Sequence, residues 1–230
     1  MKSIDYLIIS SLFAILGLSF VFLLPGNIYS REAVGKDLRE SSESALADYI
    51  RHMVNKENFA TFGFKSIRGA RSARLEKPYR VMFIGLKDLQ EYMPGTGAKS
   101  LMKDAKTLWF PVVVSGETQT KLEMVEKKGK WIPGEFGGLG PVQKVVANQK
   151  QLPELLEPIK TGAPYTLKLL KIPELYAVFL YVEGLQKEYL IPAMVQPQRF
   201  QLKNGKLYTA DEVLSKLSEY AKKIAPDKVI

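Results

Sequence analysis

The stretch LIISSLFAILGLSFVFLL, Leu7 to Leu24, decides how the rest of the chain is interpreted. It is an uncharged apolar run, preceded by Lys2 and ended by Pro25-Gly26. A helix of this length spans about 27 Å at ~1.5 Å per residue, close to the ~30 Å hydrocarbon core of a bilayer. Tyr6 and Tyr29 flank the run, where amphipathic rings favour the headgroup region. The sequence therefore predicts that residues 7–24 cross a membrane.

The same segment also has features of a secretory signal, which is removed after export. Such a signal has a basic start, an apolar stretch of about 7 to 15 residues and a small residue at the cleavage site. Ile28-Tyr29-Ser30 offers a weak cleavage site, but the apolar stretch is longer than usual. We expect residues 1–30 to be retained as a transmembrane anchor, and a cleaved signal segment is the alternative.

Two signals disagree about the side of the membrane on which residues 31–230 lie. The positive-inside rule weighs Lys2 and the α-amino group against Arg31, Lys36 and Arg39, which alone places the domain in the cytoplasm. A signal-like start instead directs the domain outward, long domains translocate regardless of charge, and a chain without cysteine suits an oxidising compartment. We expect a single-pass protein of the cell membrane with its domain on the extracytoplasmic, periplasmic side.

The region after the anchor is basic. Residues 1–30 contain one Lys and one Asp, so the formal net charge of +9 belongs entirely to residues 31–230. A positive charge of this size favours anionic partners such as lipid headgroups, surface polymers or acidic protein faces, and it also keeps a protein soluble.

Hydrophobic periodicity predicts an α+β domain in which helices flank a mixed or antiparallel sheet. Residues 31–58 form a juxtamembrane helix, and residues 141–160 form a second helical region that Pro153 interrupts. A capping box from Thr209 to Glu212 begins a last helix, whose buried stripe is Val213, Leu214, Leu217, Ala221 and Ile224. Strands are expected over 79–84, 108–114, 120–125, 165–170, 175–182, 188–195 and 199–202, with Asn204-Gly205 as a hairpin turn.

Residues 59–160 and 161–230 share an order of short motifs, which indicates two pseudo-repeated α+β halves. The strand after Lys77-Pro78-Tyr79 corresponds to the one after Ala163-Pro164-Tyr165. Trp109 to Val114 likewise corresponds to Leu190 to Val195, and Lys128-Gly129 to Asn204-Gly205. Strand-proline-strand patterns also recur by chance in sheet proteins, so an accidental match is the alternative. A duplication implies a groove between the halves.

A row of basic residues occupies every third position over sixteen residues. Three residues per turn aligns such a row only in a polyproline II segment, because a helix winds it around its axis and a strand alternates it between faces. An ordered row of this kind would suit a polyanion or an acidic protein surface, whereas a solvated loop is the alternative. This candidate binding site, called the basic row below, comprises Lys65, Arg68, Arg71, Arg74, Lys77 and Arg80.

Catalytic motifs are incomplete. Ser100-Leu-Met-Lys103 and Lys160-Thr-Gly162 resemble two of the three elements of serine β-lactamases and penicillin-binding proteins, but no Ser-Asp-Asn element lies between them and the chain is too short for that fold. Met93 to Ser100 lacks the glycines of a phosphate-binding loop, and Gly134 to Gly140 lacks a dinucleotide-binding register. With one histidine, His52, and no cysteine, we expect no catalytic site, no metal and no cofactor.

These observations predict a membrane-anchored extracytoplasmic binding or scaffolding protein, an accessory subunit of a membrane complex. Its expected partners are the membrane through residues 7–24 and either other subunits or an anionic surface. Nucleic acid is not expected, because few aromatic residues interleave with the basic row. The alternatives are an envelope hydrolase using Ser100 and Lys103, and a secreted ligand-binding protein whose first thirty residues are removed.

Overall fold

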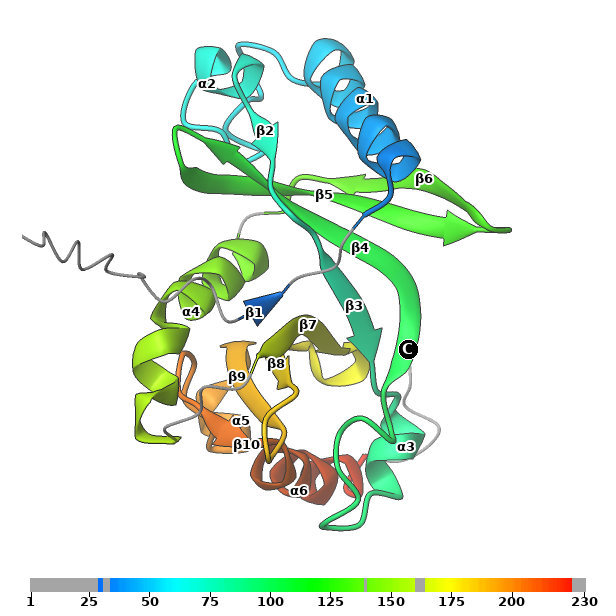
Figure 1. Cartoon of the computed structure of the whole chain (residues 1–230), viewed down its shortest axis with the longest axis vertical. Helices are drawn as coiled ribbons and strands as arrows, with labels where there is room; N and C mark the ends of the chain where they lie inside the picture. The colour runs from blue at the N-terminus through cyan, green and yellow to red at the C-terminus, as the bar shows by residue number, and fades with distance from the viewer. Residues whose placement is uncertain (1–28, 31–33, 139, 160–163, 225–230) are drawn as a thin grey trace, which may run out of the picture.

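The computed structural model describes residues 29–30, 34–138, 140–159 and 164–224. Within them the chain forms one large, mostly antiparallel sheet with helices on both faces (Figure 1). This architecture confirms the predicted α+β class. The predicted span over residues 7–24 lies outside the described residues, and no helix inside them is both long and apolar enough to cross a bilayer.

The elements follow one another in the chain as a helical N-terminal region, a first set of strands, a long helix and a second set of strands. The helices are α1 (Lys36–His52), α2 (Ile67–Arg71), α3 (Leu86–Gln90), α4 (Pro141–Leu156), α5 (Pro197–Phe200) and α6 (Ala210–Ala221). The strands are β1 (Tyr29–Ser30), β2 (Arg74–Leu75), β3 (Tyr79–Phe83), β4 (Lys103–Val114), β5 (Glu117–Lys127), β6 (Lys130–Phe136), β7 (Tyr165–Ile172), β8 (Ala177–Glu183), β9 (Tyr189–Met194) and β10 (Tyr208–Thr209).

Two antiparallel runs of strands meet at a central parallel pair. The order is β10-β9-β8-β7-β3-β4-β5-β6, and β3 lies parallel to β7 with Val81 opposite Leu169. β1 pairs in parallel with the first residues of β7. β2 pairs with the end of β4, at Val112 and Val113, whereas β3 pairs with the earlier part of β4, up to Trp109. Tyr29 and Ser30 therefore lie near the centre of the sheet, although α1 lies at one end of the molecule (Figure 1).

The core has three parts. β8 is buried on both faces over residues 177–182, as expected for a central strand that is covered on both sides. One of these faces packs against α3 and α6, and the other packs against α4. A third cluster lies under α1, which rests on strands β4 to β6 through Ala45 and Leu46.

The two strand sets of the predicted duplication lie on opposite sides of the central pair. The suggested match of Trp109–Val114 with Leu190–Val195 aligns β4 with β9. β4 lies next to the central strand β3, whereas β9 lies two strands from β7, so the matched strands occupy different positions relative to the central pair. The two halves are joined by hydrogen bonds between β3 and β7 in one continuous sheet. The duplication itself stays a prediction.

Most predicted elements agree with the structure, and three do not. Asn204-Gly205 lies in a turn but does not form a hairpin, because β10 pairs with β9 and not with a strand over residues 199–202. Pro153 does not interrupt α4, because Leu152 and Leu156 on either side of it are buried against the sheet. Residues 199–202 do not form a strand. Pro197 begins the short helix α5 instead, and its carbonyl accepts a hydrogen bond from the amide of Gln201 (2.8 Å).

Candidate functional site

The basic row does not form one extended segment. Lys65 precedes α2, Arg68 and Arg71 belong to α2, Arg74 lies in β2, Lys77 follows it, and Arg80 lies in β3. The predicted polyproline II geometry is therefore wrong.

Local capping is the physical reason for this difference. The hydroxyl of Ser66 accepts a hydrogen bond from the amide of Gly69 (3.0 Å), which starts α2, and Ala70 within that helix is fully buried. Arg68 and Arg71 therefore belong to one short helix and are not spaced along an extended segment.

Two members of the row are paired with carboxylates. Lys65 lies 2.5 Å from Glu117, and Arg80 lies 2.7 Å from Asp104. Arg68 is exposed on α2. Arg71, Arg74 and Lys77 are the three that the structure brings to a common depression.

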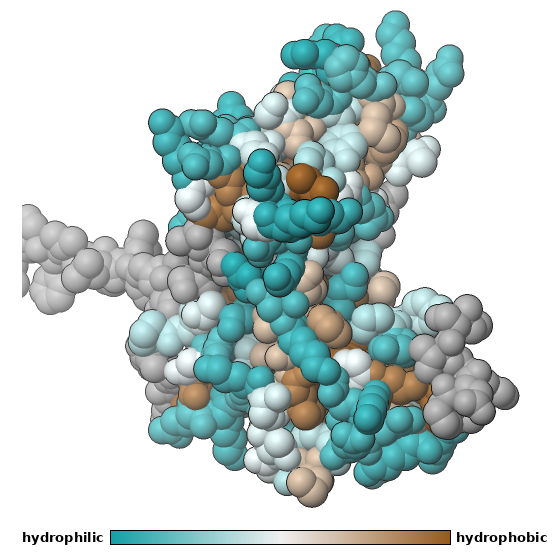
Figure 2. All heavy atoms as spheres, turned by 90° about the vertical axis from the view of Figure 1, so that its right-hand side faces the viewer, coloured by the Kyte–Doolittle hydropathy of each residue, from teal (hydrophilic) through white to brown (hydrophobic). Residues whose placement is uncertain are grey.

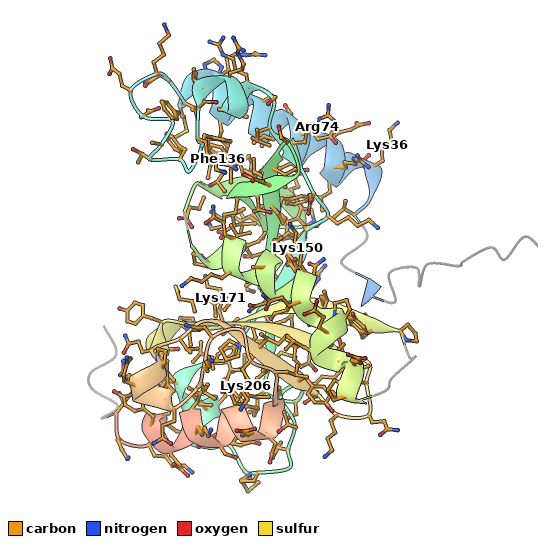
Figure 3. The ribbon with its side chains drawn as sticks, turned by 90° about the vertical axis from the view of Figure 1, so that its left-hand side faces the viewer. Lys36, Arg74, Phe136, Lys150, Lys171 and Lys206 are labelled. Atoms are coloured by element: carbon orange, nitrogen blue, oxygen red, sulfur yellow. The ribbon has the colours of Figure 1, made fainter. Side chains whose placement is uncertain are left out.

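That depression, called the α1–β2 groove below, runs between α1 and the segment from α2 to β2. Its larger part has a volume of about 690 Å³, and an adjoining part of about 240 Å³ shares Arg39, Glu43 and Leu75 with it. Figure 3 shows Arg74 beside α1, at the end of the molecule opposite Lys206. Its apolar lining residues, called its apolar floor below, are Leu46, Ala47, Ile50, Val54, Ala73 and Leu75.

The periodicity of α1 explains why it forms one wall of the groove. The α1 residues that line it recur every three or four positions, as residues on one helical face do. The neighbouring face is held by Tyr49, whose hydroxyl donates a hydrogen bond to the carbonyl of Gly134 (2.7 Å) and whose ring stacks on Phe136. The helix is therefore fixed on its β6 side, and the other flank borders the groove.

The groove carries an excess of positive charge. Four arginines line its larger part, and Lys77 lines the smaller part, against the carboxylates of Glu43 and Glu76. Glu43 is already engaged by Arg39 at 3.0 Å. Within the described residues, Arg51, Arg71 and Arg74 have no ion pair.

Sequence reasoning missed Arg39 and Arg51. Both lie outside the three-residue spacing of the basic row, and they join it only because α1 packs beside β2. The available signal was their position on the same face of α1 as its apolar stripe: Arg39 lies seven residues before Leu46, and Arg51 lies four residues after Ala47.

Ser100 and Lys103 do not share a helix face. The Ser100 hydroxyl lies within hydrogen-bonding distance of the carbonyls of Thr96 and Gly97. Lys103 begins β4 and lies 2.6 Å from Asp88. The arrangement has no base beside the hydroxyl, and the Lys160-Thr-Gly162 motif lies outside the described residues.

The loop over residues 93–100 binds carboxylates of this same chain. The amides of Ala98 and Lys99 donate to Glu188 (2.5 and 3.2 Å), and the amide of Gly95 donates to Asp211 (2.5 Å). Burial, followed by hydrogen bonding to Asp211, raises the pKa of Tyr92 to about 12. The hydrogen bond from the Gly95 amide, followed by that from Tyr92, lowers the pKa of Asp211. These contacts join the loop to α6 and to the start of β9, a structural role.

A buried lysine on β5 lies beside Trp109. Lys121 approaches the Trp109 ring (4.8 Å to its centre) and pairs with Glu135 at 2.7 Å, while the indole N–H donates to Glu123 (2.7 Å). Lys171 lies over the same ring at 5.2 Å. Glu123 and Lys171 also line a small cavity of about 200 Å³ near the junction of the two strand sets.

A second depression among the described residues, of about 660 Å³, lies beside the start of α1 and is lined by Leu38, Arg80, Lys130 and Trp131 among others. Figure 2 shows one face of the molecule as mainly hydrophilic, with small, separate hydrophobic patches. Among the described residues, no three His, Asp or Glu side chains are grouped so that they could hold a metal ion, and His52 is exposed at the end of α1.

Comparison of the chain with protein families, with curated proteins and with solved structures gave no match. Function is therefore inferred from the geometry of the groove.

Proposed function

We propose that this chain is a membrane-anchored binding protein, an accessory subunit of a membrane complex with its domain on the extracytoplasmic side. Its α1–β2 groove is the surface that contacts an acidic partner protein. The observation that carries this proposal is the charge of the groove: five cationic side chains surround an apolar floor, against two carboxylates.

The combination of charge and apolar floor favours a protein partner over a bare anionic surface. A lipid headgroup layer or a polymer would contact the exposed cations and leave the apolar walls unused. A protein segment with acidic and apolar side chains can cover both, and it buries the apolar area of Leu46, Ile50 and Leu75. Each exposed ion pair contributes at most about 1 kcal/mol, so the arginines must act together.

The pairing of β1 supports a retained anchor. Tyr29 and Ser30 lie opposite Tyr165 and Thr166 of β7, and cleavage after Ser30 would remove this strand from the sheet. Tyr29 lies five positions after Leu24, and an extended chain of that length reaches at most about 18 Å. An anchor that ends at Leu24 therefore places the centre of the sheet close to the membrane, where other membrane subunits are accessible.

The test compares two variants of the full-length chain in native membranes. In the groove variant, Arg39, Arg51, Arg71 and Arg74 are changed to Gln. In the control, the same charge is removed from four exposed lysines elsewhere: Lys127, Lys128, Lys203 and Lys222. Cross-linked partners are then quantified by mass spectrometry.

We expect the groove variant to lose cross-links to a membrane protein with an acidic extracytoplasmic segment, and the control to keep them. Equal cross-linking by the two variants would exclude the groove as the contact. N-terminal sequencing tests the anchor independently, since a mature chain that begins near Arg31 in the soluble fraction would favour the secreted ligand-binding protein.

A further inference from the structure

β2 has an open side. Its register with β4 places Arg74 opposite Val113, and the amide of Glu76 donates to the carbonyl of Pro111 (2.9 Å). Backbone groups alternate in direction along a strand, so the N–H and C=O of Leu75 point away from β4. Within the described residues, β4 is the one strand that pairs with β2. The outward backbone groups of Leu75 are therefore in position to pair with a further strand.

This open side borders the α1–β2 groove. Leu75 lines both parts of the groove, and Leu46 and Ile50 of α1 line its larger part. A groove between a helix and the open side of a strand suits an extended peptide, because main-chain hydrogen bonds provide affinity and side-chain pockets provide specificity.

The charge distribution defines the chemistry of that peptide. Arg39 and Arg51 approach from α1, and Arg71 and Arg74 approach from the opposite wall, with the apolar floor between them. Successive side chains of an extended segment point to opposite faces. A segment in which acidic and apolar residues alternate can therefore direct one set to the arginines and the other to the floor.

We infer that the occupant of the groove is an extended acidic segment of a partner protein, which adds to β2 as a strand. The inference rests on the proposed function and specifies the partner. Along α1 the lining extends from Arg39 to Arg51, about 18 Å at ~1.5 Å per residue. About five to six extended residues, at ~3.3 Å each, fill that length.

The probe is a fluorescent nine-residue peptide in which Glu alternates with Val or Leu, titrated into the full-length chain in neutral detergent. One comparison peptide carries Gln in place of Glu. A second is methylated on alternate backbone nitrogens and has the same side chains. A third has the same composition reordered so that its acidic and apolar residues occupy opposite faces of a helix.

We expect the alternating peptide to bind with the highest affinity. Methylation should weaken binding at least about fivefold, because it removes at least one main-chain hydrogen bond worth about 1 kcal/mol. Changing Arg71 and Arg74 together to Gln should also weaken binding roughly tenfold, whereas Arg68→Gln, on the same helix but outside the groove, should have little effect.

Leu75 provides the matched backbone test. Leu75→Pro removes the outward N–H, and proline is tolerated at an open strand edge on this side. Leu75→Ala also truncates the leucine side chain but keeps the N–H. Leu75→Pro should therefore weaken binding more than Leu75→Ala, because it also loses the hydrogen bond from the Leu75 N–H to a peptide carbonyl. Methylation, which removes the peptide N–H that donates to the carbonyl of residue 75, should weaken binding in both variants.

The outcomes separate the two levels of the proposal. If methylated and unmethylated peptides bind equally while the arginine variant weakens both, the acidic partner stands and strand addition is overturned. Preference for the helical peptide likewise overturns strand addition alone. If binding is insensitive to Arg71 and Arg74, or if the Gln peptide binds as well as the Glu peptide, both the groove and its extended occupant are excluded.

Discussion

Tyr49 and Phe136, 87 positions apart in the sequence, stack with their ring centres 5.0 Å apart and their planes within 11°. The Tyr49 hydroxyl also donates to the carbonyl of Gly134. These two contacts fasten α1 to β6 and thereby set the position of the wall that α1 presents to the groove.

The first prediction concerns this attachment. Tyr49→Phe keeps the stacked ring but leaves the Gly134 carbonyl without its donor, so we expect a loss of about 1 kcal/mol in the free energy of unfolding. Tyr49→Ala also removes the stacked ring and should cost at least about 2 kcal/mol. Urea unfolding of the two variants measures both values. If Tyr49→Ala were no less stable than wild type, α1 would be held mainly by other contacts.

The second prediction concerns Glu188, which orders the loop over residues 93–100. It accepts hydrogen bonds from the amides of Ala98 and Lys99 and from the hydroxyl of Tyr181. Glu188→Ala leaves these donors unpaired and should lower the free energy of unfolding by about 2 kcal/mol. Hydrogen exchange at the two amides should become faster in this variant. Glu188→Gln retains two acceptor lone pairs and should lie between the variant and wild type.

The third prediction concerns acid. Asp211 has a lowered pKa in the folded protein, so it binds a proton more readily when the chain is unfolded. Its contribution to stability is present above the ordinary aspartate pKa and is lost as the pH falls through the folded value. Asp211→Asn should therefore flatten the acid limb of the stability curve below about pH 5. An unchanged acid limb would assign acid unfolding to other carboxylates.

The fourth prediction concerns base. The pKa of Tyr92 rises from 10.0 to about 12 on folding, so the folded state holds its proton more tightly than the unfolded state. This contribution is present below pH 10 and is lost as the pH rises toward 12. Tyr92→Phe should be less stable than wild type at pH 7, and the difference should narrow between pH 10 and 12. Urea unfolding at these pH values measures the difference, and a constant gap would contradict the assignment.

The fifth prediction concerns Lys121, whose side chain is 4% exposed although its partner Glu135 is 63% exposed. Lys121→Met keeps the apolar stem beside Trp109. Water can solvate the exposed Glu135, and Glu123, 3.8 Å from the lysine, still accepts the indole N–H, so we expect a change below about 1 kcal/mol. Lys121→Ala also opens a cavity and should cost about 2 kcal/mol or more. If Met and Ala proved equally destabilising, the charge of Lys121 would matter more than its packing.

The α6 helix shows which features local sequence predicts well. The Thr209 hydroxyl accepts a hydrogen bond from the Glu212 amide at 3.3 Å, and Val213, Leu214 and Leu217 are fully buried. Each of these features depends on residues within four positions of one another. The strands β3, β4, β5, β7, β8 and β9 were recognisable for the same reason.

The basic row shows where local reasoning fails. Its three-residue spacing suggested polyproline II, but the Ser66 cap and the burial of Ala70 stabilise a helical turn there. Similarly, Pro197 and the buried ring of Phe200 replace a predicted strand with α5. In both cases a cap or a tertiary contact outweighed a pattern that any exposed segment can display.

The sequence by itself determined the features that depend on neighbours in the chain: the apolar run of residues 7–24, the α+β class and the first residues of α4 and α6. Only the tertiary structure decided the groove, because Arg39 and Arg51 are separated from Arg71 and Arg74 by an unrelated loop and meet them through the packing of α1 on the sheet. It also decided the open side of β2, since the direction of the Leu75 amide is set by its register with β4. Periodicity along one segment reports which face of that segment is apolar, but it contains no information about which distant segment will lie against it.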